Sequence, residues 1–82
     1  MYPAVNSVIA QDNYQLGVTF KNGEQGILDM KPYLDFGIFQ KLKDPIHFSN
    51  VTVAFDTIEW DTVEIDLDPE FVYEKAIKTL TF

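Results

Sequence analysis

The side chains of this chain that could do chemistry are mostly carboxylates, and they gather in one segment. Residues 44–74 hold nine acidic residues and no basic one, and seven of those acids lie between Asp56 and Glu70. Carboxylates can bind divalent cations, exchange protons in acid–base catalysis, or face a basic protein. A solvated strand face that binds nothing is the simplest reading of the same pattern, so the segment alone leaves these alternatives open.

Spacing argues against the catalytic and metal-binding alternatives. Residues 66–70 place acids at every second position, as a calcium loop does, but the Gly at position six and the Glu at position twelve are missing. Paired carboxylates need a pocket that separates their pKa values, and the pattern predicts none. The single histidine, His47, lies near Ser49 without a context that makes Ser49 a nucleophile. We therefore predict a non-enzymatic protein with no catalytic residue, no metal site and no cofactor.

The charge favours a basic partner protein as the functional alternative. Concentrated like charge destabilises a compact chain, and a positively charged partner would relieve that repulsion. Aromatic residues are enriched in interface cores, so aromatic side chains in an irregular stretch are added to the prediction. A second copy of the chain is also a candidate partner. The predicted partner surface consists of Glu59, Asp61, Glu64, Asp66, Asp68, Glu70, Phe36 and Phe39.

Composition excludes several classes of protein. The chain has 82 residues, a formal net charge of -7, no cysteine and no arginine. Disulfides and thiolate zinc sites are therefore excluded, and direct nucleic-acid binding is not expected without arginine forks for phosphate and guanine. No apolar run approaches the ~18 residues of a membrane helix, and residues 1–4 lack the features of a signal peptide. We expect a single domain, residues 1–82, in the cytoplasm.

The clearest local structure is a hairpin. Apolar and polar residues alternate over residues 14–20, which predicts a half-buried strand. Asn22-Gly23 then predicts a two-residue type I′ turn into a second strand. In that register Val18 faces Ile27, and Leu28 falls on the opposite face of the sheet.

Strands are also expected over residues 5–10, 51–55 and 58–67, with a tight turn or a bulge at Asp61-Thr62 where the apolar residues change parity. We predict that Phe20, Phe55 and Trp60 belong to the core. The fold class that follows is α+β, with a mostly antiparallel sheet of about five strands and two short helical segments.

The helical segments are a turn at residues 31–34 that continues into a helix over residues 37–43, and a second helix from Pro69 to about Lys78. Asp68 is the expected N-cap of the second helix, and Lys75 and Lys78 suit its C-terminal end. This helix is expected to bury Phe71, Val72, Ala76 and Leu80.

The order and spacing of several motifs resemble a bacterial family of domains of unknown function, number 2442. The motifs are Tyr14-x-Leu16-x-Val18-x-Phe20-x-Asn22-Gly23-Glu24 with Asp29, Leu42-x-Asp44 with Phe48, Ile58-x-Trp60, and Asp66-Leu67-x-Pro69-Glu70 with Tyr73. The resemblance covers nearly the whole chain, about residues 5 to 74. Where members of the family commonly have Pro-Asn-Gly after the tryptophan, this chain has Asp61-Thr62-Val63.

The resemblance implies a small α+β fold related to the N-terminal domain of another bacterial protein. It carries no catalytic residues over, because none are established for the family. Members often lie beside a second small protein, and a toxin–antitoxin role has been suggested for such pairs. The resemblance therefore implies an antitoxin-like or regulatory protein. A small carboxylate- or metal-dependent enzyme and a self-associating structural domain remain alternatives.

Overall fold

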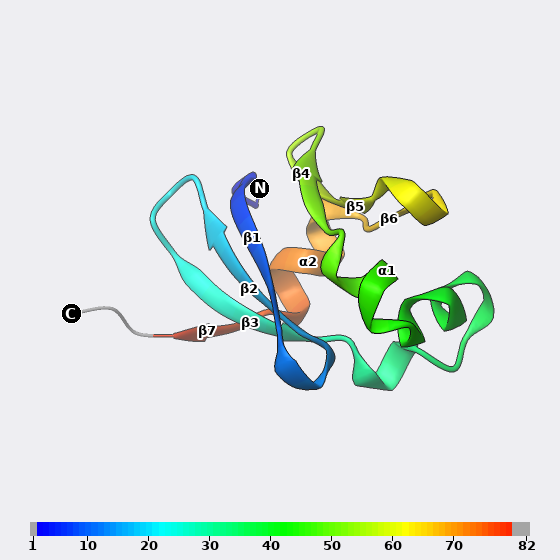
Figure 1. The fold of residues 1–82 in the computed structure, drawn as a ribbon. Coiled ribbons are helices and arrows are strands. Elements are labelled where there is room, and N and C mark those ends of the chain that lie inside the picture. The colour runs from blue at the N-terminus through cyan, green and yellow to red at the C-terminus, as the bar shows by residue number, and fades with distance from the viewer. Residues whose placement is uncertain (1, 80–82) are drawn as a thin grey trace.

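The computed structural model, which describes residues 2–79, is built on two antiparallel β-sheets (Figure 1). The first sheet has the strand order β1-β2-β3-β7 and the second has the order β4-β5-β6. The α+β class is confirmed, but the single sheet of about five strands is wrong. The strands are β1 (Val5–Gln11), β2 (Gln15–Phe20), β3 (Gln25–Asp29), β4 (Thr52–Ala54), β5 (Thr57–Trp60), β6 (Ile65–Asp66) and β7 (Ile77–Thr79).

The β2–β3 hairpin lies at Asn22-Gly23 as expected, but its loop has three residues. The Phe20 amide donates to the Glu24 carbonyl at 2.8 Å, and the Gly23 amide donates to the Phe20 carbonyl at 3.0 Å. Gly23 has a φ of 92°, which fits the left-handed position that ends a three-residue loop. The two-residue loop was wrong because only Gly23, and not Asn22, takes a positive φ.

One extra loop residue moves every side chain of β3 to the other face of the sheet. Val18 lies opposite Gly26 and Leu16 lies opposite Leu28. Leu28 is therefore buried on the same face as Leu16, whereas Ile27, predicted on that face, is only half-buried. The prediction that Leu28 falls on the far side was wrong for this reason alone.

The core lies between the two sheets and is closed by α2 (Pro69–Lys75), which contacts both β3 and β5 (Figure 1). Trp60 is fully buried, and its indole Nε1 donates to the Phe48 carbonyl at 2.9 Å. Phe20 and Trp60 are confirmed as core residues. The buried apolar residues are Val5, Leu16, Val18, Phe20, Leu28, Met30, Leu34, Leu42, Phe48, Ile58, Trp60, Ile65, Leu67, Val72 and Ala76.

The helices differ from the expectation in place and length. The helix predicted over residues 37–43 is a 3₁₀ helix (Gly37–Lys43), and the α-helix α1 (Pro45–Ser49) follows it. Asp44 follows the last residue of the 3₁₀ helix and also caps α1, since its Oδ1 accepts from the Ile46 amide at 2.9 Å. Shorter 3₁₀ turns lie at Asp12–Tyr14, Lys31–Tyr33 and Asp61–Val63.

Helix α2 begins as predicted, because Asp68 Oδ1 accepts from the Glu70 amide at 2.8 Å and Pro69 follows the cap. It ends at Lys75 rather than near Lys78, since Ala76 is extended and β7 pairs with the edge of β3. Pairing with β3 gives the backbone of β7 hydrogen bonds that replace those a longer helix would have formed internally. Phe71 packs against the core, and Val72 and Ala76 are buried. The prediction for Leu80 lies outside the described residues.

Phe55 contradicts its predicted place in the core. Ala54 pairs with Thr57, so Phe55 and Asp56 alone form the β4–β5 turn, with φ values of 52° and 65°. A side chain at the apex of such a turn points away from both strands, and Phe55 is 94% exposed. The Val5 amide donates to the Asp56 carbonyl at 3.0 Å, which fixes this turn beside the start of β1.

Candidate functional site

Four of the predicted carboxylates line one shallow hollow on the second sheet. Glu59 on β5 lies directly opposite Asp66 on β6. The 3₁₀ turn Asp61–Val63 joins these strands, and the residue after it, Glu64, is left-handed with a φ of 57°. This geometry brings Glu59, Asp61, Glu64 and Asp66 around a hollow of about 270 Å³, which Ile65 also lines. We call these four carboxylates and Ile65 the acidic hollow.

The tight turn predicted at Asp61-Thr62 is therefore confirmed, and it is what gathers the acids. Alternation with apolar residues would place Glu64, Asp66 and Asp68 on one face if they lay in a single strand. The structure instead places Glu64 in the turn, Asp66 in β6 and Asp68 at the cap of α2. Glu64 and Asp66 nevertheless line the same hollow, because the turn at Asp61–Val63 reverses the direction of the chain.

Lysines from the first half of the chain do not neutralise the acidic hollow. The described ion pairs join Lys21 to Asp56 at 3.5 Å, Lys31 to Asp29 at 3.4 Å, and Lys43 to Asp35. Within residues 2–79, no described ion pair involves a carboxylate of the acidic hollow. Its negative charge therefore faces solvent without a cation from the described chain.

An apolar hollow of about 260 Å³ adjoins the acidic hollow. It is lined by Tyr33, Phe39, Leu67 and Phe71, with Asp66 and Asp68 at its rim. The rings of Tyr33 and Phe71 meet edge to face, with centroids 5.2 Å apart. Asp66 lines both hollows. We call this second site the aromatic hollow.

The predicted partner surface is thus only partly brought together. Phe39 and Asp68 line the aromatic hollow, and the four carboxylates named above line the acidic one. Glu70 is exposed on α2 and Phe36 is 66% exposed, but neither lines either hollow. Leu67 and Phe71 were missed as members of the surface, because separate elements have to fold together before these side chains meet Phe39.

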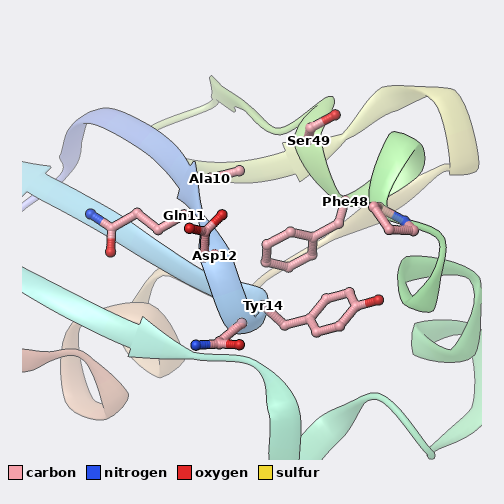
Figure 2. Close-up of a pocket in the computed structure, with 8 residues that line it drawn as sticks. Ala10, Gln11, Asp12, Tyr14, Phe48 and Ser49 are labelled. Carbon is pink, nitrogen blue, oxygen red and sulfur yellow. The ribbon is translucent and has the colours of Figure 1, made fainter.

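A third hollow, of about 430 Å³, lies between the β1–β2 turn and α1 (Figure 2). Figure 2 shows Asp12 and Tyr14 on the turn side, and Phe48 and Ser49 on the α1 side. The Tyr14 hydroxyl donates to the Lys43 carbonyl, and the Tyr14 and Phe48 rings meet edge to face at 5.2 Å. No sequence signal pointed to this hollow, since it arises only where the hairpin meets α1.

Ser49 and His47, the two side chains considered as a nucleophile and its base, are both within hydrogen-bond distance of main-chain carbonyls. Ser49 lies in α1 rather than in a strand, and its hydroxyl donates to the Ile46 carbonyl at 2.9 Å. His47 Nδ1 lies 3.3 Å from the Lys41 carbonyl. Among the described residues, no group of three or more His, Asp or Glu side chains is placed to hold a metal ion.

Comparison with known proteins identifies a family, and the function of that family is unknown. The model of the family described as "Protein of unknown function (DUF2442)" matches residues 5–78. No curated protein and no solved structure matches the chain. Across residues 2–79, no helix has the length and apolar character needed to cross a membrane.

Proposed function

The chain belongs to this family of unknown function, and from that premise we propose that it is a non-enzymatic interaction module that binds a basic partner protein. Such a module could serve as an antitoxin-like or regulatory subunit in the cytoplasm. The observation that carries the proposal is that Asp66 lines both the acidic and the aromatic hollow. One continuous surface therefore offers negative charge on one side of Asp66 and an apolar pocket on the other.

The partner that fits this surface is a segment with lysine or arginine residues beside one apolar side chain. The basic residues would lie over the acidic hollow, whose carboxylates take part in no described ion pair within residues 2–79. The apolar side chain would enter the aromatic hollow between Tyr33, Phe39 and Phe71. Apolar anchors supply most of the affinity of such interfaces, and charge supplies association rate and specificity.

Synthetic peptides test this proposal with defined chemistry. We would titrate the isotope-labelled protein with acetyl-KKWKK-amide, with acetyl-KKSKK-amide and with acetyl-EEWEE-amide, following backbone amide shifts by NMR. The first peptide should shift amides of residues 59–68 together with those around Phe39 and Phe71. The serine peptide should bind about tenfold more weakly, since it lacks the apolar anchor, and the acidic peptide should not bind.

A matched pair of variants locates the contact. Asp66→Asn removes the carboxylate shared by the two hollows, whereas Asp12→Asn removes an exposed carboxylate in the β1–β2 turn. Only the first should weaken binding of the basic peptide, and rising salt should weaken binding further. Shifts scattered over the whole surface, or equal effects of the two variants, would refute the proposal. Capture of a partner from the native host at low and at high salt would then identify the physiological ligand.

A further inference from the structure

The tip of the β4–β5 turn combines two unfavourable features. Both turn residues, Phe55 and Asp56, are left-handed, with φ values of 52° and 65°. Two-residue turns of this kind strongly favour Asn-Gly, because a bulky L-residue with a positive φ is strained. Phe55 occupies the first of these positions, where an asparagine would relieve part of the strain.

The Phe55 side chain also buries almost none of its apolar surface against its own chain. Its side chain is 94% exposed, more than any other exposed large apolar residue described. Burial of the ring does not offset the strain of this backbone, because the ring is exposed. A contact outside the molecule would bury the ring and so offset the strain.

A complementary hollow lies beside the same ring. Tyr2, Ala4 and Pro69, together with Phe55 and Asp56, line a hollow of about 630 Å³. Figure 1 shows the β4–β5 turn next to the start of β1, and the bond from the Val5 amide to the Asp56 carbonyl, 3.0 Å long, holds the two together. A projecting ring and a hollow on one patch are what a two-fold contact between identical molecules requires.

Charge at this corner suits a second copy better than a basic partner. Lys21 and Asp56 form an exposed pair at 3.5 Å, so the patch carries one cation and one anion beside the ring. Two copies related by a two-fold axis can exchange these partners, whereas the acidic hollow of one copy would repel that of another. The patch is therefore complementary in charge to itself.

We propose that two copies of this chain associate through this corner, each Phe55 seated in the hollow lined by Tyr2, Ala4 and Pro69 of the other. This dimerisation goes beyond the binding of a basic partner and uses a different surface. A contact built from one turn and the adjoining chain end buries less than the ~1,200 Å² of stable interfaces. The dimer is accordingly weak, forming at protein concentrations on the order of 0.1–1 mM.

Sedimentation equilibrium over a range of protein concentrations, at low and at high salt, tests the proposal. Each copy carries a net charge of -7, and repulsion between two such copies outweighs the exposed Lys21–Asp56 pairs, so added salt should strengthen the dimer by screening that repulsion. Salt should weaken binding of a basic peptide, and these opposite responses separate the two proposals. In NMR dilution series, amide shifts should move at Tyr2, Ala4 and Phe55. A strictly monomeric protein at about 1 mM in high salt would overturn the proposal.

Phe55→Asn is the decisive variant because it should raise the melting temperature while weakening the dimer at least tenfold. Loss of association therefore could not be blamed on misfolding. Ile9→Asn is the matched control, since Ile9 is another apolar residue, 67% exposed, on β1, and its replacement should leave the dimer intact. A dimer that survives Phe55→Asn, or one that Ile9→Asn abolishes instead, would also overturn the proposal.

Discussion

The hydroxyl of Tyr73 on α2 donates a hydrogen bond of 2.7 Å to Glu24 Oε1, at the end of the β2–β3 loop. The Tyr73 ring also meets Phe20 edge to face, with centroids 5.1 Å apart. Together these contacts tie α2 to the hairpin. The hydrogen bond to Glu24, then burial, then the charge of Glu24 raise the pKa of Tyr73 above its ordinary value of 10.0.

Stability should therefore fall at alkaline pH for a definable reason. A raised folded-state pKa means that the unfolded chain loses the Tyr73 proton first, so the contribution is complete below pH 10.0 and is lost as the pH rises through the folded-state pKa. Tyr73→Phe should remove this part of the pH dependence in urea unfolding. Absorbance titration of the tyrosinates should show a late-titrating group in the wild type that moves toward 10.0 in Glu24→Gln. Identical titrations of the two proteins would contradict the assignment.

The three-residue loop makes a second prediction, about the register of β3. Leu28→Ala should destabilise the protein by about 2–5 kcal/mol, because Leu28 is buried opposite Leu16. Ile27→Ala should cost less than about 1.5 kcal/mol, since Ile27 is only half-buried. Urea unfolding followed by circular dichroism measures both. The two-residue loop would give the reverse order of costs.

The buried indole of Trp60 provides a third prediction. Trp60→Phe should destabilise the protein by about 2–4 kcal/mol, because it leaves a cavity and also removes the donor to the buried Phe48 carbonyl. Val53→Thr on the exposed part of β4 is the comparison, with an expected change within about 0.5 kcal/mol. Unfolding must be followed by circular dichroism here, because the variant lacks the sole tryptophan. Similar stabilities of the two variants would contradict the role of Trp60.

Repulsion within the acidic hollow makes a fourth prediction. Glu59 and Asp66 lie directly opposite on neighbouring strands, and like charges in that position destabilise a sheet. Glu59→Lys should therefore raise the free energy of unfolding by about 0.3–1 kcal/mol at low salt, with the gain shrinking as salt is added. The same variant should bind the basic peptide more weakly. A loss of stability at low salt would show that these carboxylates do not repel one another.

Local patterns predicted the parts of the fold that local chemistry decides. The cap and proline at the start of α2, the position of the first hairpin and the turn after Trp60 follow from a few adjacent residues. Division into two sheets could not be predicted, because it depends on β4, β5 and β6 pairing with one another rather than with the strands of the first hairpin. The misplaced face of Leu28 shows how a single loop residue, invisible in the alternation pattern, reverses a strand.

The candidate site was predicted in its charge and not in its shape. The acidic residues of β5 and β6 were named from composition, and their convergence depends on the turn at Asp61–Val63. Tyr33 and Phe71 come from distant segments that only tertiary packing brings together. Phe55 was assigned to the core because hydrophobicity at an alternating position does not distinguish a strand residue from a turn apex.

Pairing of β3 with β7 also governs the order in which this chain can fold. Gln25 pairs with Thr79, so one edge of the first sheet is completed by a segment that follows all three strands of the second sheet in the chain. Because α2 directly precedes β7, the nascent meander β1–β3 leaves the ribosome with the apolar side chains of Leu16, Val18 and Phe20 uncovered. Distant pairings of this kind slow folding, and the growing polypeptide therefore exposes apolar surface to chaperones until β7 has been made.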